Sequence, residues 1–226
     1  MGKARIHGHG MRRALFSIFL LSTLGLAGCT FEREGPAEYH FQEFKARAPR
    51  GNTVYVCSAY GCQTQTPVVF GPDQVKSISE LMRKTKKGDS AHEERRALAY
   101  AVGWMESYAG GVAGTKNDRP GMDWDGSGDP TQQDCVDEAT NTTAYMMVLQ
   151  SNGLLKYHTV GRPFSRGNIL LGVSNWPHWT GVLWETKNKQ KWAVDSWIYQ
   201  NGENPAVVEA EKWYVKTLAD LPKPRT

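Results

Sequence analysis

Apolar and polar residues follow two different periods along the chain, and each period predicts a different kind of element. Apolar residues recur at helical spacing from Ser90, which opens an S-x-x-E capping box, to the glycine pair 110–111. The same period predicts a second helix that opens at residues 134–135 and stops at Asn152-Gly153. Residues 110–134 are rich in Gly, Asp and Pro, have no apolar period and predict a long loop.

Short β-like runs make up most of the remaining pattern. Two of them, 179–186 and 191–198, flank a polar turn at 187–190 and predict a β-hairpin. The other predicted elements are a short helix at 73–82 and strands at 53–56, 68–70, 154–160 and 169–173. Helices combined with an antiparallel hairpin predict an α+β fold, and residues 52–226 have the length of a single domain.

Residues 1–28 have the form of an export signal. Basic residues at positions 3, 5, 12 and 13 precede an apolar run at 14–27 that is too short for a comfortable membrane span. The run ends in Leu26-Ala27-Gly28-Cys29, which resembles the lipobox of bacterial lipoproteins and implies that Cys29 carries the palmitate-type lipid. The alternative is a plain secretory signal that a cysteine follows by coincidence.

Charge and location follow from this reading of the N-terminus. The full chain has a formal charge of +4, and removing residues 1–28 removes four basic residues, so the mature chain carries 4 − 4 = 0. A neutral chain has no broad footprint for nucleic acid, so membrane contact is expected from the lipid on Cys29. Thr30 follows the lipobox; by resemblance to lipoproteins without Asp there, we expect an outer-membrane anchor facing the periplasm, with 29–51 as a tether.

Three cysteines remain after Cys29 is assigned to the anchor. Cys57 and Cys62 are close in sequence, and export places them where disulfides persist, so they are predicted to form a structural disulfide. A catalytic redox pair is the alternative, although the spacing is not C-x-x-C. Cys135 is then the odd, free thiol.

The order Cys135, His178, Asp195 is the candidate catalytic constellation. Cys135 lies at a predicted helix start, where the helix dipole and free N–H groups lower a thiol pKa. His178 begins one strand of the predicted hairpin and Asp195 lies on the other, so the hairpin is expected to bring them together. An imidazole activates a thiol nucleophile, and a carboxylate orients the imidazole.

The motifs around these residues resemble the transglutaminase-like core of the papain-related cysteine enzymes. They are QQDCVDEA at 132–139, HWTGVLW at 178–184 and KWAVDSW at 191–197. The resemblance implies a nucleophilic cysteine at a helix N-terminus, packed on an antiparallel sheet that carries the histidine and the aspartate. It also implies acyl transfer at amides of a peptide or protein substrate in the envelope: peptide hydrolysis, amide hydrolysis or crosslinking. Asp134 departs from the family's Gly-x-Cys pattern, and its carboxylate opposes thiolate formation.

Two other functions stay open at this point. One is an inactive envelope lipoprotein that binds peptides through the same fold. The other is an NlpC/P60-like peptidoglycan endopeptidase, a class that usually has a second histidine or another polar residue where Asp195 stands. Each residue of the constellation also has an ordinary structural interpretation, as a buried thiol, a core histidine or a hairpin residue.

Additional groups beside Cys135 are candidates for supporting roles. The backbone N–H of Cys135 and the side chains of Gln132 and Gln133 are candidate oxyanion donors. Trp176 and Trp179 are candidate walls of an acyl-donor cleft. The chemistry requires no cofactor, but the loop before Cys135 resembles an EF-hand and would bind calcium through Asp123, Asp125, Ser127, Asp129 and Asp134. The alternative for this loop is a cluster of Gly/Asp turns.

Overall fold

The computed structural model describes residues 1–2, 33–121, 123–167 and 177–215. The predicted lipobox cysteine Cys29, the predicted strand 169–173 and Trp176 lie outside these ranges. Within them, none of the helices has the length and apolar character needed to cross a membrane.

The described elements mix helices with two antiparallel sheets, as the α+β prediction requires. In chain order they are α1 (Glu38–Glu43), β1 (Thr53–Ser58), β2 (Thr64–Val69), α2 (Pro72–Thr85), α3 (Ala91–Ala113), the 3₁₀ turn η1 (Trp124–Gly126), α4 (Cys135–Ser151), β3 (His158–Arg166), β4 (His178–Glu185), β5 (Lys191–Asp195), β6 (Ala206–Glu209) and α5 (Ala210–Val215). β1 and β2 form one hairpin, and β3-β4-β5-β6 form a four-stranded sheet in that order.

The predicted hairpin β4–β5 forms the middle of the larger sheet. Alternate residues of its strands point to opposite faces. Leu183 and Val194 belong to the main core, whereas Val182 and Ala193 belong to a second core that includes Trp213. The centre of the sheet is therefore buried on both faces, and this holds the first residue of β4 and the last residue of β5 in fixed positions.

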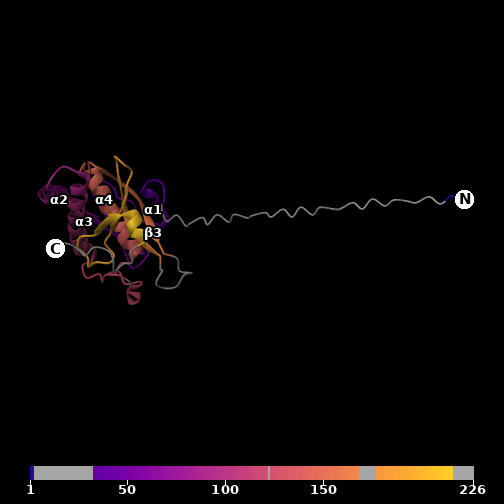
Figure 1. Cartoon of the computed structure of the whole chain (residues 1–226). Coiled ribbons are helices and arrows are strands. Elements are labelled where there is room, and N and C mark those ends of the chain that lie inside the picture. Colours follow the sequence, from indigo (N-terminus) through magenta and orange to yellow (C-terminus); the bar gives the residue numbers. More distant parts are fainter. Residues whose placement is uncertain (3–32, 122, 168–176, 216–226) are drawn as a thin grey trace. The chain divides into compact units, whose positions relative to one another are not determined.

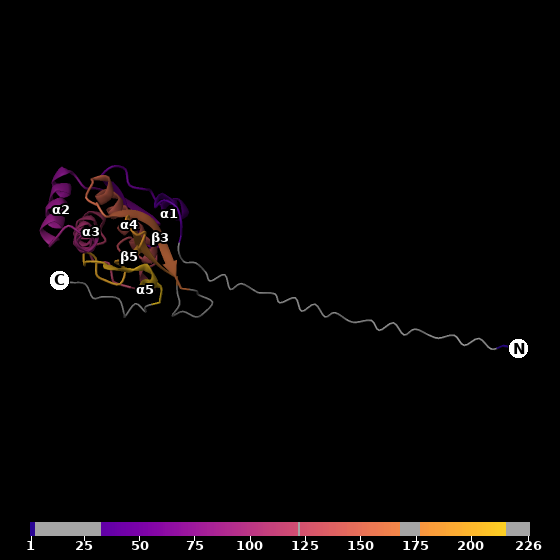
Figure 2. The same cartoon turned by 45° about the horizontal axis from the view of Figure 1, so that its top comes forward.

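α4 is the central helix of the domain, and most of its residues are buried. It lies between the α2–α3 pair on one side and α1 with β3 on the other, as both ribbon views show (Figures 1 and 2). Gly181 of β4 permits the close approach of α4 to the sheet, because a Cβ at position 181 would lie 2.9 Å from Met146 and 3.1 Å from Thr142 of α4. This packing sets the N-terminus of α4 against the start of β4.

Most predicted helix ends are confirmed, but two lie too early: α2 continues to Thr85 instead of stopping at residue 82, and α3 also runs past its predicted stop. Ser90 caps α3 by accepting a hydrogen bond from the N–H of Glu93, and α4 begins and ends within a residue of its prediction. However, α3 continues past the glycine pair to Ala113 and ends at Gly114, which has a positive φ of 89°. Gly110 serves packing instead, because a Cβ there would overlap the Asn201 side chain.

The predicted strand at 154–160 is displaced, and the predicted tether 29–51 is too long. β3 starts only at His158, because buried Glu94 of α3 accepts hydrogen bonds from the N–H groups of Lys156 and Tyr157 and holds these residues outside the strand. Within 29–51, α1 is part of the fold: Phe41 is in the main core. The polar composition of this segment concealed one short apolar face.

Candidate active site

Cys135 is the first residue of α4 and is 5% exposed. Asp134 caps the helix, accepting hydrogen bonds from the N–H groups of Val136 (3.0 Å) and Asp137 (2.9 Å). Asp137 completes a capping box by accepting from the N–H of Asp134. Among the described residues, no acceptor is found for the N–H of Cys135 itself, so this donor remains for a ligand.

The Cys135 sulfur lies against the first residues of β4. Its thiol donates to the Pro177 carbonyl oxygen at 3.6 Å, and the backbone N–H of Trp179 donates to the sulfur. These two residues flank His178. Within the described part of the chain, no hydrogen bond joins the sulfur directly to the imidazole.

His178 and Asp195 are paired as predicted. The imidazole Nε2 lies 2.7 Å from Asp195 Oδ2, and both side chains are buried. Because a carboxylate only accepts hydrogen bonds, the imidazole carries a proton on Nε2 and donates it to Asp195. Among the described residues, Nδ1 of His178 has no hydrogen-bond partner. The geometry thus leaves one imidazole nitrogen for proton exchange with the thiol.

A third group, the indole of Trp213, completes the surroundings of Asp195. Its Nε1–H donates to the same Oδ2 at 2.8 Å. The rings of Trp197 and Trp213 lie 4.6 and 5.5 Å from the imidazole, centroid to centroid. They exclude water from the His178–Asp195 pair, which strengthens its hydrogen bond.

The thiol of Cys135 is neutral at rest. Burial raises its pKa well above the ordinary value, and the Asp134 carboxylate raises it further, against the Trp179 N–H, which lowers it. The expected lowering by the helix N-terminus is therefore outweighed. The Asp134 carboxylate therefore opposes formation of the Cys135 thiolate, as its position next to Cys135 in the sequence indicated.

The predicted disulfide forms and holds a loop against the N-terminus of α4. Cys57 and Cys62 are bonded, and the backbone N–H groups of Tyr60 and Cys62 donate to buried Asp137 at 2.9 and 2.6 Å. The intervening Gly61 N–H donates to Asp134 Oδ2 at 3.1 Å. This loop carries Tyr60 to the site.

A cavity of about 220 Å³ opens beside the nucleophile. It is lined by Tyr60, Gly121, Trp124, Ser127, Asp134, Cys135 and Trp197. The predicted wall Trp179 is not among these residues. It packs instead on His40 and Phe44 of the α1 region, with the Arg33 guanidinium over its ring.

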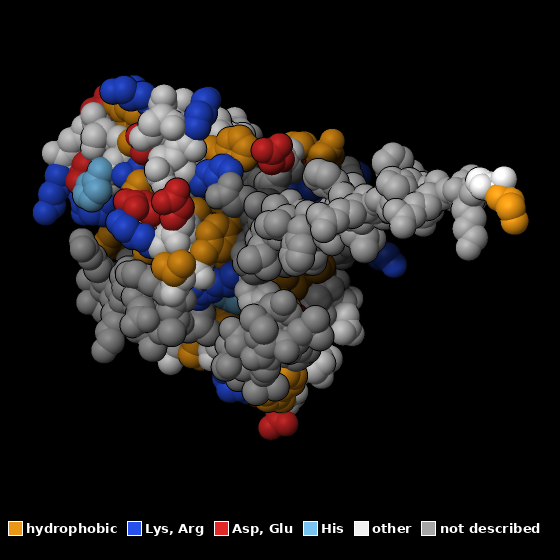
Figure 3. All heavy atoms as spheres, turned by 45° about the vertical axis from the view of Figure 1, so that its right-hand side comes forward, with side chains coloured by type: hydrophobic (Ala, Val, Ile, Leu, Met, Phe, Trp, Pro, Cys, Tyr) orange, Lys and Arg blue, Asp and Glu red, His pale blue; other side chains and the backbone are white. Residues whose placement is uncertain are grey.

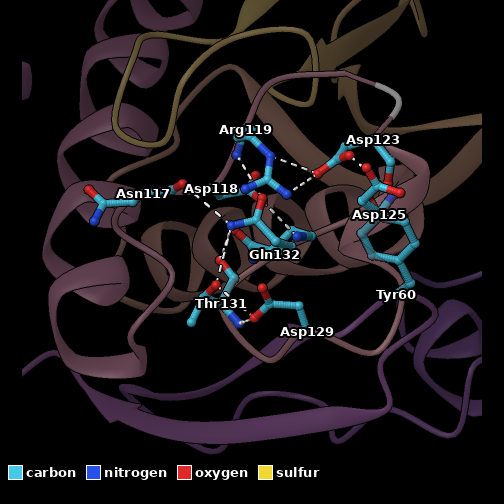
Figure 4. Close-up of polar contacts among 10 residues, drawn as sticks. Tyr60, Asn117, Asp118, Arg119, Asp123, Asp125, Asp129, Thr131 and Gln132 are labelled. Atoms are coloured by element: carbon cyan, nitrogen blue, oxygen red, sulfur yellow. Dashed lines mark hydrogen bonds and ion pairs between the residues drawn. The ribbon is translucent and has the colours of Figure 1, made fainter.

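The side chains of Gln132 and Gln133 do not have the role predicted for them. The Gln132 amide group bonds residues of its own loop, donating to Asn117 and Thr131 and accepting from the N–H of Arg119 (Figure 4). The Gln133 amide N–H donates to the Cys57 carbonyl at 2.9 Å. Because both amide donors are engaged in fixing the loop, the backbone N–H of Cys135 is the candidate oxyanion donor that remains.

The five predicted calcium ligands are not gathered around one point. Asp123 forms an ion pair with Arg119, Asp129 caps Thr131, and Asp134 caps α4 (Figure 4). Among the described residues, the one group of converging metal-ligand atoms is Cys57, Cys62 and Asp137, whose sulfurs form the disulfide. The arrangement matches the turn-cluster alternative.

Three buried carboxyl groups, those of Glu106, Asp118 and Glu138, act on one another near the start of α4. Glu138, one turn after Cys135, is hydrogen-bonded to Glu106 of α3 and accepts from Ser196 Oγ at 2.8 Å. Burial raises the pKa of Glu106 to about 7, and both burial and the Glu106 charge raise that of Glu138. Burial, followed by the Glu138 charge, also raises the pKa of Asp118 to about 8. These carboxyl groups are held protonated at low pH, which links the stability of the site to pH.

Sequence reasoning named Cys135, His178 and Asp195 but missed Trp213 and Tyr60, which also lie at the candidate site. Trp213 lies in a short apolar tail segment that carries no motif, so no signal pointed to it. The sequence did offer a signal for Tyr60, which lies between the two closely spaced cysteines Cys57 and Cys62.

Comparisons of the chain with protein-family models, with curated protein sequences and with solved structures gave no match.

Proposed function

We propose that this chain is a cysteine-dependent acyl-transfer enzyme that hydrolyses peptide or amide bonds, built on a papain-like, transglutaminase-like core. The observation that carries the proposal is the 2.7 Å hydrogen bond between His178 and Asp195, at the strand start against which the Cys135 sulfur lies. A nucleophile at a helix start, an imidazole with one free nitrogen and an orienting carboxylate make up a nucleophile–base–orienter set.

The reaction takes place in two acyl-transfer steps. As Cys135 Sγ forms a bond to the amide carbonyl carbon, its proton passes to His178 Nδ1. The imidazolium then protonates the departing amine as the C–N bond breaks, leaving a thioester on Cys135. In the second step His178 removes a proton from water, the hydroxide oxygen bonds to the thioester carbon, and the released thiolate takes the proton back. An amine in place of water would give crosslinking.

A neutral thiol at rest makes the base step essential. Because burial disfavours the thiolate, the proton must leave as the S–C bond forms, and His178 is the proposed base. Asp195 stabilises the imidazolium that results and fixes the imidazole orientation. The backbone N–H of Cys135 supplies an oxyanion donor at the N-terminus of α4, where the helix dipole favours negative charge.

The proposed location is the periplasmic face of the outer membrane, through lipid on Cys29. α1 begins at Glu38, 38 − 29 = 9 positions after Cys29 in the sequence. Envelope peptides are the proposed substrates. Blue Lys/Arg and red Asp/Glu side chains are interspersed on the face in Figure 3, and a mixed surface of this kind gives no support to a nucleic-acid partner.

One observation favours a second candidate, a peptide-binding lipoprotein without catalysis. The carboxylates around the buried thiol oppose its ionisation, and the sulfur donates to a backbone carbonyl instead of to the imidazole. An NlpC/P60-like activity fits the site less well, because that class usually has a second histidine or another polar residue where Asp195 stands. Exchange of Asp195 to Ala discriminates, because loss of activity supports the triad as described.

The test is the alkylation of Cys135 by iodoacetamide across pH, followed by mass spectrometry of the Cys135 peptide in the full chain. We expect alkylation at pH 7 to be at least tenfold slower in His178→Ala and unchanged in His92→Ala, an exposed histidine far from the site. Because burial raises the pKa of the thiol, the supporting result is a wild-type pH profile of alkylation that changes in His178→Ala and stays the same in His92→Ala. Equal rates in all three proteins would refute the enzyme and favour the binding lipoprotein.

A further inference from the structure

The cavity beside Cys135 has the size of a site for a single side chain. Its volume of about 220 Å³ is below the roughly 300–1,000 Å³ of sites that enclose a drug-sized ligand. Three of its lining residues are aromatic: Tyr60, Trp124 and Trp197. Tyr60 is held rigidly, because its hydroxyl donates to the Asp123 carbonyl and its backbone to Asp137.

The acidic residue in the lining of the cavity is Asp134. Its negative charge acts on both the Cys135 thiol and the Tyr60 hydroxyl. Asp118 and Asp137 also lie close by, but burial raises the pKa of both carboxyl groups and favours their neutral forms. Arg119 is the cation that acts on Tyr60, and its guanidinium is paired with Asp123.

Trp197 forms the buried part of the lining. The residue is 5% exposed and its Nε1 atom is itself buried, so Trp197 presents ring carbons to the cavity and not its N–H.

Aromatic rings and carboxylates together select for positive charge. A cation over the face of Trp or Tyr is attracted by the ring quadrupole, and tryptophan is the best of the aromatic side chains in this respect. The carboxylate of Asp134 adds direct attraction, whereas an acidic side chain would meet like charges at close range. An uncharged aliphatic side chain would contact the rings but leave the negative field uncompensated.

We propose that this cavity binds the ammonium side chain of a lysine residue in the peptide substrate, adjacent to the amide that Cys135 attacks. The proposal rests on the function proposed above and defines the substrate class of that site. The rings of Trp124, Tyr60 and Trp197 contact the side chain, and Asp134 faces the ammonium.

Binding is measured on the full chain with Cys135→Ala, so that no turnover contributes. The probes are N-acetyl-lysine methylamide, its norleucine counterpart and its glutamate counterpart, titrated by tryptophan fluorescence. We expect the lysine probe to bind at least tenfold more tightly than norleucine and the glutamate probe to bind more weakly than both. Asp134→Asn retains a capping side chain and should abolish most of the lysine preference. Trp124→Ala should weaken the binding of lysine and norleucine alike.

Glu80→Gln, which removes an exposed carboxylate on α2, is the control and should change nothing. Equal binding of the lysine and norleucine probes, or a lysine preference that survives in Asp134→Asn, would overturn the proposal. These outcomes are separable from the alkylation test. Loss of lysine preference with a reactive Cys135 refutes only the substrate class, whereas lysine preference with an unreactive Cys135 refutes only the catalysis.

Discussion

Trp213→Phe tests whether the geometry around Asp195 matters for the reactivity of the thiol. The indole Nε1–H of Trp213 and the imidazole of His178 both donate to Oδ2 of this carboxylate, at 2.8 and 2.7 Å. Among the described residues, the other oxygen, Oδ1, is buried without a donor. Removing the indole N–H therefore leaves one hydrogen bond to hold the carboxylate.

The magnitude follows from the kind of hydrogen bond that is lost. A bond to a charged group contributes about 1.5–3 kcal/mol. At about 1.4 kcal/mol per tenfold, this corresponds to a loss of roughly 10- to 100-fold in the His178-dependent rate of Cys135 alkylation. Phenylalanine retains an aromatic ring in the second core, so we expect the domain to stay folded with a stability loss of about 1–3 kcal/mol.

The assay compares alkylation rates and their pH profiles in wild type, Trp213→Phe and a matched control. Trp192→Phe is the control, because Trp192 is also on the sheet but its Nε1–H has no acceptor among the described residues. We expect the pH profile to shift only in Trp213→Phe, since only this variant changes the field at the imidazole. A rate and profile equal to those of the control would refute the positioning role of Trp213.

Two further predictions concern the surroundings of the triad. Because burial raises the Glu106 pKa to about 7 in the folded state, stability present below the unfolded pKa of about 4.3 is lost as pH rises towards 7. Glu106→Gln should therefore lose less unfolding free energy than wild type between pH 5 and 8 in urea titrations; an unchanged slope would contradict this. Replacing Cys57 and Cys62 by serine should cost about 2 kcal/mol for so short a loop. It should also change the alkylation rate of Cys135, because the loop presents Tyr60 to the cavity; identical rates would show that the loop is not part of the site.

Local sequence predicted α4 and the β4–β5 hairpin, and with them the three candidate residues Cys135, His178 and Asp195. The helix beginning at Cys135 follows from local signals, a capping aspartate and an apolar period, which act over a few residues. The pairing of His178 with Asp195 follows from the hairpin, whose short turn fixes which residues lie side by side. The Cys57–Cys62 disulfide follows from the close spacing of these two cysteines in the sequence.

Other features depend on contacts between segments far apart in the chain. Trp213 reaches Asp195 only because α5 packs on the second face of the sheet, and Tyr60 reaches the cavity only because Asp137 accepts its backbone N–H across 77 positions. The raised pKa of the Cys135 thiol also results from tertiary packing. Local sequence supplies the helix N-terminus that lowers a thiol pKa, but burial and neighbouring carboxylates, which are properties of the assembled fold, outweigh it.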